Sequence, residues 1–127
     1  MTTNNTDIVF KDISYKVVGL AMKVHSELGG GFLEKVYENA LTFLLEKEGI
    51  TARQQAPITV YFEGQSVGEY FADILVDGKI ILELKTAEKI ADAHRTQAIH
   101  YLRATGIRLA MILNFGEKSF EYERLVV

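Results

Sequence analysis

The chain has 127 residues, a formal net charge of −3 and no cysteine. This length fits one domain with enough apolar residues to bury one core, so we expect residues 1–127 to form a single domain. The lack of cysteine excludes disulfides, thiolate metal sites and a cysteine nucleophile, which leaves oxygen or imidazole ligands for any metal. Such ligands favour hard cations such as Mg²⁺ or Mn²⁺.

No apolar run approaches the roughly 18 residues of a membrane span, and the N-terminal sequence lacks the charged-then-apolar order of a signal peptide. We therefore expect a cytoplasmic protein with no membrane partner. The net charge argues against a protein that coats nucleic acid non-specifically, because phosphate binding needs clustered Lys and Arg. It does not exclude a nuclease, since carboxylates gathered around a metal also lower the net charge.

The first half of the chain has the apolar spacing of two helices. In residues 12–28 apolar side chains recur at helical intervals, and the glycines at 29–31 end the helix. Residues 33–48 repeat the pattern up to Gly49. We expect residues 1–10 to be disordered.

The second half predicts an α/β (α+β) fold with a mixed β-sheet and flanking helices. Three strands in a meander come first, and a helix then crosses over to a fourth strand, which must be parallel to a strand already in the sheet. The expected strands are 58–62, 67–76, 79–85, 109–115 and 120–125, with the crossover helix at 92–105.

The residues that suggest chemistry are Asp73 on one expected strand and Glu83 and Lys85 on the next. Glu83 and Lys85 project from the same face, roughly 7 Å apart along the strand. Whether Asp73 joins them depends on the turn. A two-residue type I′ hairpin at Asp77-Gly78 would place Asp73 and Glu83 on opposite faces, with no shared metal.

A three-residue loop, Val76-Asp77-Gly78 with a left-handed Gly78, instead makes Asp73 and Glu83 diagonal neighbours on one face. It pairs Leu75 with Lys79 and Asp73 with Ile81.

The apolar pattern favours this three-residue loop. The type I′ register would mix apolar and charged residues and bury charge on the core side, which costs several kcal/mol for an unpaired ion. The three-residue register separates them: one face carries Tyr70, Ala72, Ile74, Ile80, Leu82 and Leu84, and the other carries Phe71, Asp73, Leu75, Ile81, Glu83 and Lys85.

Two acidic side chains, with the backbone carbonyl between Glu83 and Lys85, suit a Mg²⁺ that keeps several waters and meets a substrate phosphate. Lys85 could orient the attacking water or offset charge on the phosphate. The alternative is a surface ion pair of Lys85 with Glu83 or Asp73. Spacing alone leaves both interpretations open.

These residues resemble a known signature. Asp73 followed by Glu83-Leu84-Lys85 is similar to the D…(D/E)-x-K motif of the PD-(D/E)XK phosphodiesterase superfamily, and the element order resembles its αβββαβ, restriction-endonuclease-like core. Upstream, the segment from Gly31 through Glu34 to Tyr37 resembles the G-x-x-E-x-x-Y motif of the GxxExxY protein family, small bacterial and archaeal proteins.

The resemblance implies roles for single residues. Asp73 and Glu83 would be the metal-binding acids, Lys85 the catalytic lysine, and Glu34 the helix acid that some branches add to the metal shell. On ordinary grounds Glu34 is also simply a glutamate favoured in the first turn of a helix.

Gln97 and Tyr101 resemble the Q-x-x-x-Y element of RecB-like nucleases. The glutamine would be catalytic, near the lysine or metal, and the tyrosine would face the substrate. The alternative is the margin of an amphipathic helix. Tyr37 is a second candidate for substrate contact, although it lies on an apolar stripe and is expected mostly in the core. Glu38 is either an acid that supports the site or solvent-exposed, and His25 could face the site.

Three functions remain open. The first is a Mg²⁺- or Mn²⁺-dependent nuclease acting on nucleic-acid phosphodiesters. The second is a non-catalytic binding or adaptor protein that keeps the nuclease fold, and the third is a metal hydrolase of a small phosphorylated substrate. Because no nucleic-acid-reading module is evident, a homo-oligomer or a protein partner could supply specificity.

Overall fold

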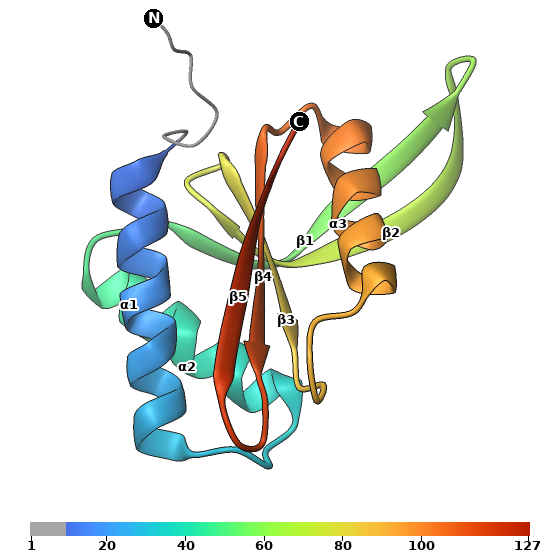
Figure 1. The fold of residues 1–127 in the computed structure, drawn as a ribbon. Helices are drawn as coiled ribbons and strands as arrows, with labels where there is room; N and C mark the ends of the chain where they lie inside the picture. Colours follow the sequence, from blue (N-terminus) through green and yellow to red (C-terminus); the bar gives the residue numbers. More distant parts are fainter. Residues whose placement is uncertain (1–9) are drawn as a thin grey trace, which may run out of the picture.

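The computed structural model describes residues 10–127, in which three helices pack on a five-stranded sheet (Figure 1). The predicted element order is confirmed. Of the segment expected to be disordered, 1–10, only Phe10 lies within the described residues. The elements are α1 (Lys11–Leu28), α2 (Glu34–Lys47), β1 (Ala52–Phe62), β2 (Gln65–Val76), β3 (Ile80–Lys85), α3 (Asp92–Thr105), β4 (Leu109–Phe115) and β5 (Phe120–Val126).

The sheet is mixed, as predicted, and its strands follow the order β1-β2-β3-β4-β5. All neighbouring pairs are antiparallel except β3 and β4, which are parallel because α3 crosses over between them. Strand β1 begins at Ala52, well before the predicted start at residue 58. Its first residues include Arg53, Gln54 and Gln55, which hide the alternation that would mark a strand. None of the helices in residues 10–127 is long and apolar enough to cross a membrane.

Helices cover both faces of the sheet, as Figure 1 shows, with α1 and α2 on one side and α3 on the other. The first core cluster joins Val17 and Leu41 to Leu82, and the second joins Ile81 to Leu102. Strand β4 is buried along its whole length, and β3 is buried except for its last residue. This two-sided burial explains why both strands read as apolar runs.

The β2–β3 hairpin has a three-residue loop, so the odd loop is confirmed, but it lies one residue further along than predicted. Val76 pairs with Ile80, and the loop is Asp77-Gly78-Lys79, with positive φ at Asp77 and Gly78. The reason is burial. Val76 is fully buried and stays in the strand, whereas exposed Lys79 takes the last loop position. The predicted pairing of Leu75 with Lys79 is therefore wrong. The next position beyond the paired residues would bring Asp73 level with Glu83, and the Asp73 N–H donates to the Glu83 side chain.

Gln55 interrupts the β1–β2 ladder: its φ of 51° is left-handed, and it has no partner there. Ala52 before it packs in the first core cluster and Ala56 after it in the second. Beyond Gln55 the strands form an arm, residues 56–72, that runs beside α3 and projects past it (Figure 1). The prediction that Tyr70 and Ala72 share the face of Ile74 is wrong. Ala72 belongs to the cluster on the α3 side, and Tyr70 lies against Tyr101 of α3.

Candidate active site

Asp73 and Glu83 lie side by side where β2 and β3 separate. Backbone pairing between these strands reaches only Ile74 with Leu82, and side chains continue the hydrogen bonding. The Asp73 N–H donates to Glu83 Oε2 at 3.2 Å, and the Leu84 N–H donates to Asp73 Oδ2 at 2.7 Å. These backbone hydrogen bonds use one oxygen of each carboxylate, so the second oxygen of each is a potential metal ligand.

Burial sets the electrostatics of this pair. Glu83 is only 3% exposed, and this burial, with the neighbouring charge of Asp73, raises its pKa to about 8. Burial also raises the pKa of Asp73, to which the charge of Glu38 adds. Two desolvated acids that repel one another are stabilised in their ionised forms by a cation. The donor set therefore fits a hard divalent metal ion.

Lys85, the last residue of β3, points to α3. Its Nζ donates to Gln97 Oε1 at 3.2 Å, so the structure brings together the predicted lysine and glutamine. Among residues 10–127, Lys85 forms no ion pair within 4.0 Å of Asp73 or Glu83. The alternative interpretation, a surface ion pair of Lys85 with one of these acids, does not describe this geometry.

Glu34 is the first residue of α2 and is exposed to solvent. Partial burial raises its pKa, the charge of Lys85 lowers it and the charge of Asp73 raises it, so Glu34 lies within electrostatic reach of the site. Within residues 10–127, no three His, Asp or Glu side chains are grouped so as to hold a metal ion. The arrangement offers a pair of acids, the kind of set with which Mg²⁺ keeps waters and a substrate phosphate.

Glu38, left open between a supporting and an exposed role, is buried and bonded to three side chains. Its carboxylate accepts from Lys35 Nζ at 2.9 Å, Gln54 Nε2 at 2.7 Å and Gln55 Nε2 at 3.1 Å. The Gln55 side chain also lowers the pKa of Asp73, so contacts through Glu38 and Gln55 connect α2 to the site. Gln54 and Gln55 were not predicted as residues near the site, because nothing in the sequence pattern distinguishes them from other polar residues at the start of a strand.

Asn114 also lies near the site and was not predicted from the sequence. It is fully buried and pairs with Lys85 in the β3–β4 ladder. Its Oδ1 accepts from the Ala87 N–H at 2.9 Å and its Nδ2 donates to the Ala87 carbonyl at 3.0 Å, which holds the segment that follows Lys85. The sequence pattern could have indicated it, because Asn114 is the one polar residue in the apolar run of β4.

Tyr37, predicted to contact substrate, is fully buried and stacks on Phe115 with ring centroids 4.7 Å apart. Its hydroxyl donates to the Gly29 carbonyl at 2.7 Å and accepts from the Phe32 N–H at 3.2 Å. These contacts assign it to the core and to the loop that leads into α2. The Nε2 atom of His25 and the Gly116 carbonyl oxygen are hydrogen-bonded at 2.7 Å, which connects α1 to the β4–β5 turn.

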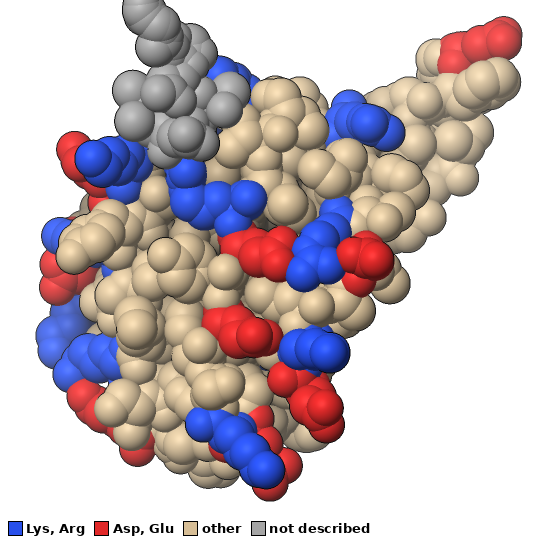
Figure 2. Space-filling view, in the orientation of Figure 1, with Lys and Arg blue, Asp and Glu red and all other residues tan. Residues whose placement is uncertain are grey.

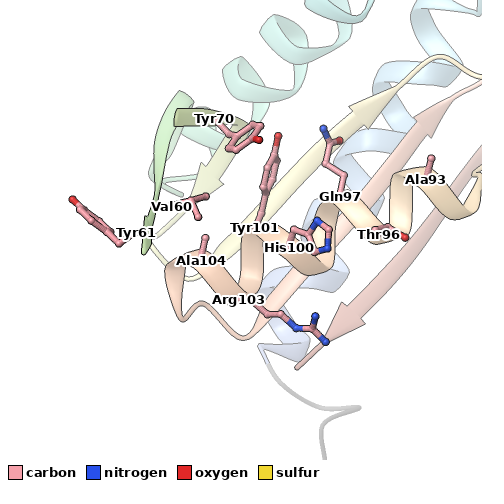
Figure 3. A pocket seen from close by; sticks show the side chains of 10 residues that line it. All are labelled: Val60, Tyr61, Tyr70, Ala93, Thr96, Gln97, His100, Tyr101, Arg103 and Ala104. Atoms are coloured by element: carbon pink, nitrogen blue, oxygen red, sulfur yellow. The ribbon is translucent and has the colours of Figure 1, made fainter. Parts of the chain in front are cut away.

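Tyr101 lies within electrostatic reach of Glu83 and Asp73, at the floor of a groove between α3 and the arm. Burial raises its pKa, and the charges of Glu83 and Asp73 raise it further. The groove has a volume of about 810 Å³ (Figure 3). It is lined by Val60, Tyr61, Tyr70, Ala93, Thr96, Gln97, His100, Tyr101, Arg103 and Ala104.

Comparison with known proteins agrees with this architecture. A family model of the PD-(D/E)XK nuclease superfamily matches residues 11–125, nearly the whole chain. The chain therefore belongs to the PD-(D/E)XK nuclease superfamily, whose nucleases generally use divalent metal ions.

Among solved structures, the one entitled "Crystal structure of SSO0001" is similar, with a TM-score of 0.59 and 15% sequence identity. The similarity covers 73% of this chain and 50% of that protein, so this chain spans about half the length of its structural relative. At this identity the likeness shows a shared fold alone. No curated protein matches the sequence.

Proposed function

We propose that residues 1–127 form a single-domain, divalent-metal-dependent nuclease of the GxxExxY branch of the superfamily, acting on nucleic-acid phosphodiesters in the cytoplasm. The observation that carries the proposal is the pairing of Asp73 with buried Glu83, beside a lysine that a glutamine holds in place. Membership of the superfamily supports it.

In this proposal Asp73 and Glu83 hold the metal, Mg²⁺ or Mn²⁺. Glu34, which is not grouped with them closely enough for direct coordination, contributes a third carboxylate through water. A bound divalent ion polarises the phosphate and lowers the pKa of a bound water. Lys85 orients the attacking water or offsets negative charge that develops on the phosphate. Gln97 positions the Lys85 ammonium through their 3.2 Å hydrogen bond.

Protonation of Glu83 controls whether the metal can bind. With a pKa raised to about 8 by burial and by Asp73, Glu83 is mostly protonated at pH 7 when no metal is present. Metal binding must displace that proton. Cleavage should therefore increase as the pH rises from 6 to 8.

The test is a cleavage assay on single-stranded DNA, duplex DNA and RNA with Mg²⁺ or Mn²⁺, and with EDTA as the metal-free control. Lys85→Ala should abolish cleavage, whereas Lys23→Ala, which replaces an exposed lysine on α1, should leave it unchanged. Cleavage that survives Lys85→Ala would contradict the assigned site.

Calorimetry separates the remaining alternatives. The nuclease proposal predicts that wild type binds Mg²⁺ or Mn²⁺ and that Asp73→Ala does not. Absence of any metal-dependent heat would favour an adaptor that only keeps the fold. Metal binding with cleavage of a small chromogenic phosphodiester, but of no nucleic acid, would favour a hydrolase of small phosphorylated substrates.

A further inference from the structure

The arm formed by β1 and β2 carries large apolar side chains into solvent. Tyr61 is 66% exposed and Tyr70 is 49% exposed, and three more residues of the hairpin are similarly exposed: Phe62, Val67 and Phe71. The arm is attached to the rest of the sheet only at its base and projects beyond α3 (Figure 1). Large apolar side chains exposed together on one projecting hairpin indicate an interaction site.

One side of the arm forms the groove with α3, and this groove leads to the proposed active site. The rings of Tyr70 and Tyr101 are neighbours, with centroids 5.8 Å apart. Tyr101 is 6% exposed and forms the floor, while Tyr70 presents its ring to solvent. Gln97 extends on the same side of α3 as Tyr101 (Figure 3), and its Oε1 accepts from Lys85. A ligand in the groove would therefore reach Lys85.

The chemistry of the lining indicates which ligand fits. The described residues that line the groove include three tyrosines, His100 and Arg103, and no carboxylate. On the face seen in Figure 2, acidic and basic side chains are interspersed and no large basic patch forms. A duplex presents phosphates outward and needs clustered cations, whereas a single strand offers base faces that stack on aromatic rings.

We propose that this groove binds single-stranded nucleic acid, with bases stacked on Tyr70 and Tyr61 and with Arg103 facing the backbone phosphates. The inference rests on the proposed nuclease function, because it names the substrate class of the same site. Single-stranded DNA and RNA share the stacking chemistry. Gln97 and Tyr101 lie where the bound strand passes from the groove to Asp73, Glu83 and Lys85.

The test is fluorescence anisotropy of the full chain with labelled oligonucleotides of about 15 nucleotides, oligo-dT and oligo-U, and a duplex of equal length. EDTA prevents cleavage, so binding is measured without the metal site. Tyr70→Ala and Tyr61→Ala should each weaken single-strand binding roughly 5- to 150-fold. Tyr70→Trp, which keeps a stacking surface, should retain it.

Two further variants sharpen the test. Tyr15→Ala removes a tyrosine that is 82% exposed on α1, away from the groove, and should bind like wild type. Arg103→Gln should reduce the salt dependence of single-strand affinity by about 0.7 in the log–log slope. Circular dichroism and thermal unfolding check that each variant is folded.

Some outcomes would overturn the groove assignment. Tighter binding of the duplex, no binding of either single strand, or a Tyr70→Ala variant that binds like Tyr15→Ala would each do so. The oligo-dT and oligo-U arms decide whether DNA or RNA is preferred.

Failure of the groove and failure of the nuclease proposal can be told apart. If single strands bind through Tyr70 but no metal supports cleavage, the groove assignment stands and the nuclease proposal fails. If the protein cleaves duplex DNA and Tyr70→Ala cleaves it equally well, the groove assignment fails and the nuclease proposal stands.

Discussion

The two halves of strand β2 lie in opposite environments. The half that ends at Val76 is packed between helices on both faces of the sheet and carries Asp73 beside Glu83. The other half, with Tyr70, belongs to the arm and is mostly exposed. Reactive groups need fixed geometry, which a rigid, two-sided core provides, whereas a binding surface can tolerate an exposed and adaptable segment. One strand thus connects a candidate catalytic end to a candidate binding end.

The largest expected effect is at the packed end. Asp73→Asn keeps the size of the side chain but removes the charge that a metal needs, so cleavage should fall on the order of a thousandfold. The measurement is the single-turnover cleavage rate in Mg²⁺. Asp12→Asn, an exposed acid on α1, is the matched control. Comparable rates in the two variants would show that Asp73 has no special role in cleavage.

A second effect is the pH dependence of stability in metal-free protein. The pKa of Glu83 is raised from 4.5 to about 8 in the folded chain, so the folded state keeps a proton that the unfolded chain releases. This contribution to stability is fully present below about pH 4.5 and is lost as the pH rises through 8. Wild type should therefore lose roughly 2–5 kcal/mol relative to Glu83→Gln over this range.

Urea denaturation in EDTA at several pH values measures this difference. If the free energy of unfolding changed with pH by the same amount in wild type and in Glu83→Gln, Glu83 would not be held protonated in the folded state.

A smaller effect is expected from Asn114→Leu. The substitution preserves the approximate volume but leaves the Ala87 N–H and carbonyl without their partner, which should cost about 2–4 kcal/mol. Because Asn114 holds the segment after Lys85, the cleavage rate should fall as well. Asn39→Leu, at an exposed position on α2, is the control for the amide-to-aliphatic change. Equal stability of the two variants would contradict the role assigned to Asn114.

The smallest effect is expected on the arm. Phe62→Ala removes a mostly exposed ring and should change the free energy of unfolding by less than about 0.5 kcal/mol. Phe115→Ala removes a buried ring that stacks on Tyr37 and should cost about 3–5 kcal/mol. Similar losses in the two variants would mean that the arm belongs to the folded core and is not a free surface.

Much of this architecture follows from local patterns. The crossover helix, residues 92–105, was predicted with its observed limits because Gly106 ends an amphipathic run. The proximity of Asp73 and Glu83 followed from the three-residue loop, which the parity of Ile74, Ile80 and Leu82 favoured. Ala72 does not keep that parity, because it packs on the α3 side. That parity is a local property, since side chains alternate with a period of two.

The position of the β2–β3 loop, the path of the arm and the groove depend on tertiary contacts. Whether Val76 or Lys79 enters the loop is decided by burial of Val76 against the helices, which two adjacent strands cannot reveal. The left-handed Gln55 interrupts the β1–β2 ladder, so that Ala56 after it packs on the α3 side, and glutamine gives no sequence signal for such a conformation. The groove follows from that change of face and was therefore not predicted.

The proposed divalent-metal site of Asp73 and Glu83 can be tested by calorimetric titration with Mg²⁺ or Mn²⁺ at pH 7. Measured in two buffers of different ionisation enthalpy, metal binding to wild type should release on the order of one proton, supplied by Glu83. Glu83→Gln should release none. Absence of metal-dependent heat in wild type, or binding without proton release, would contradict the account.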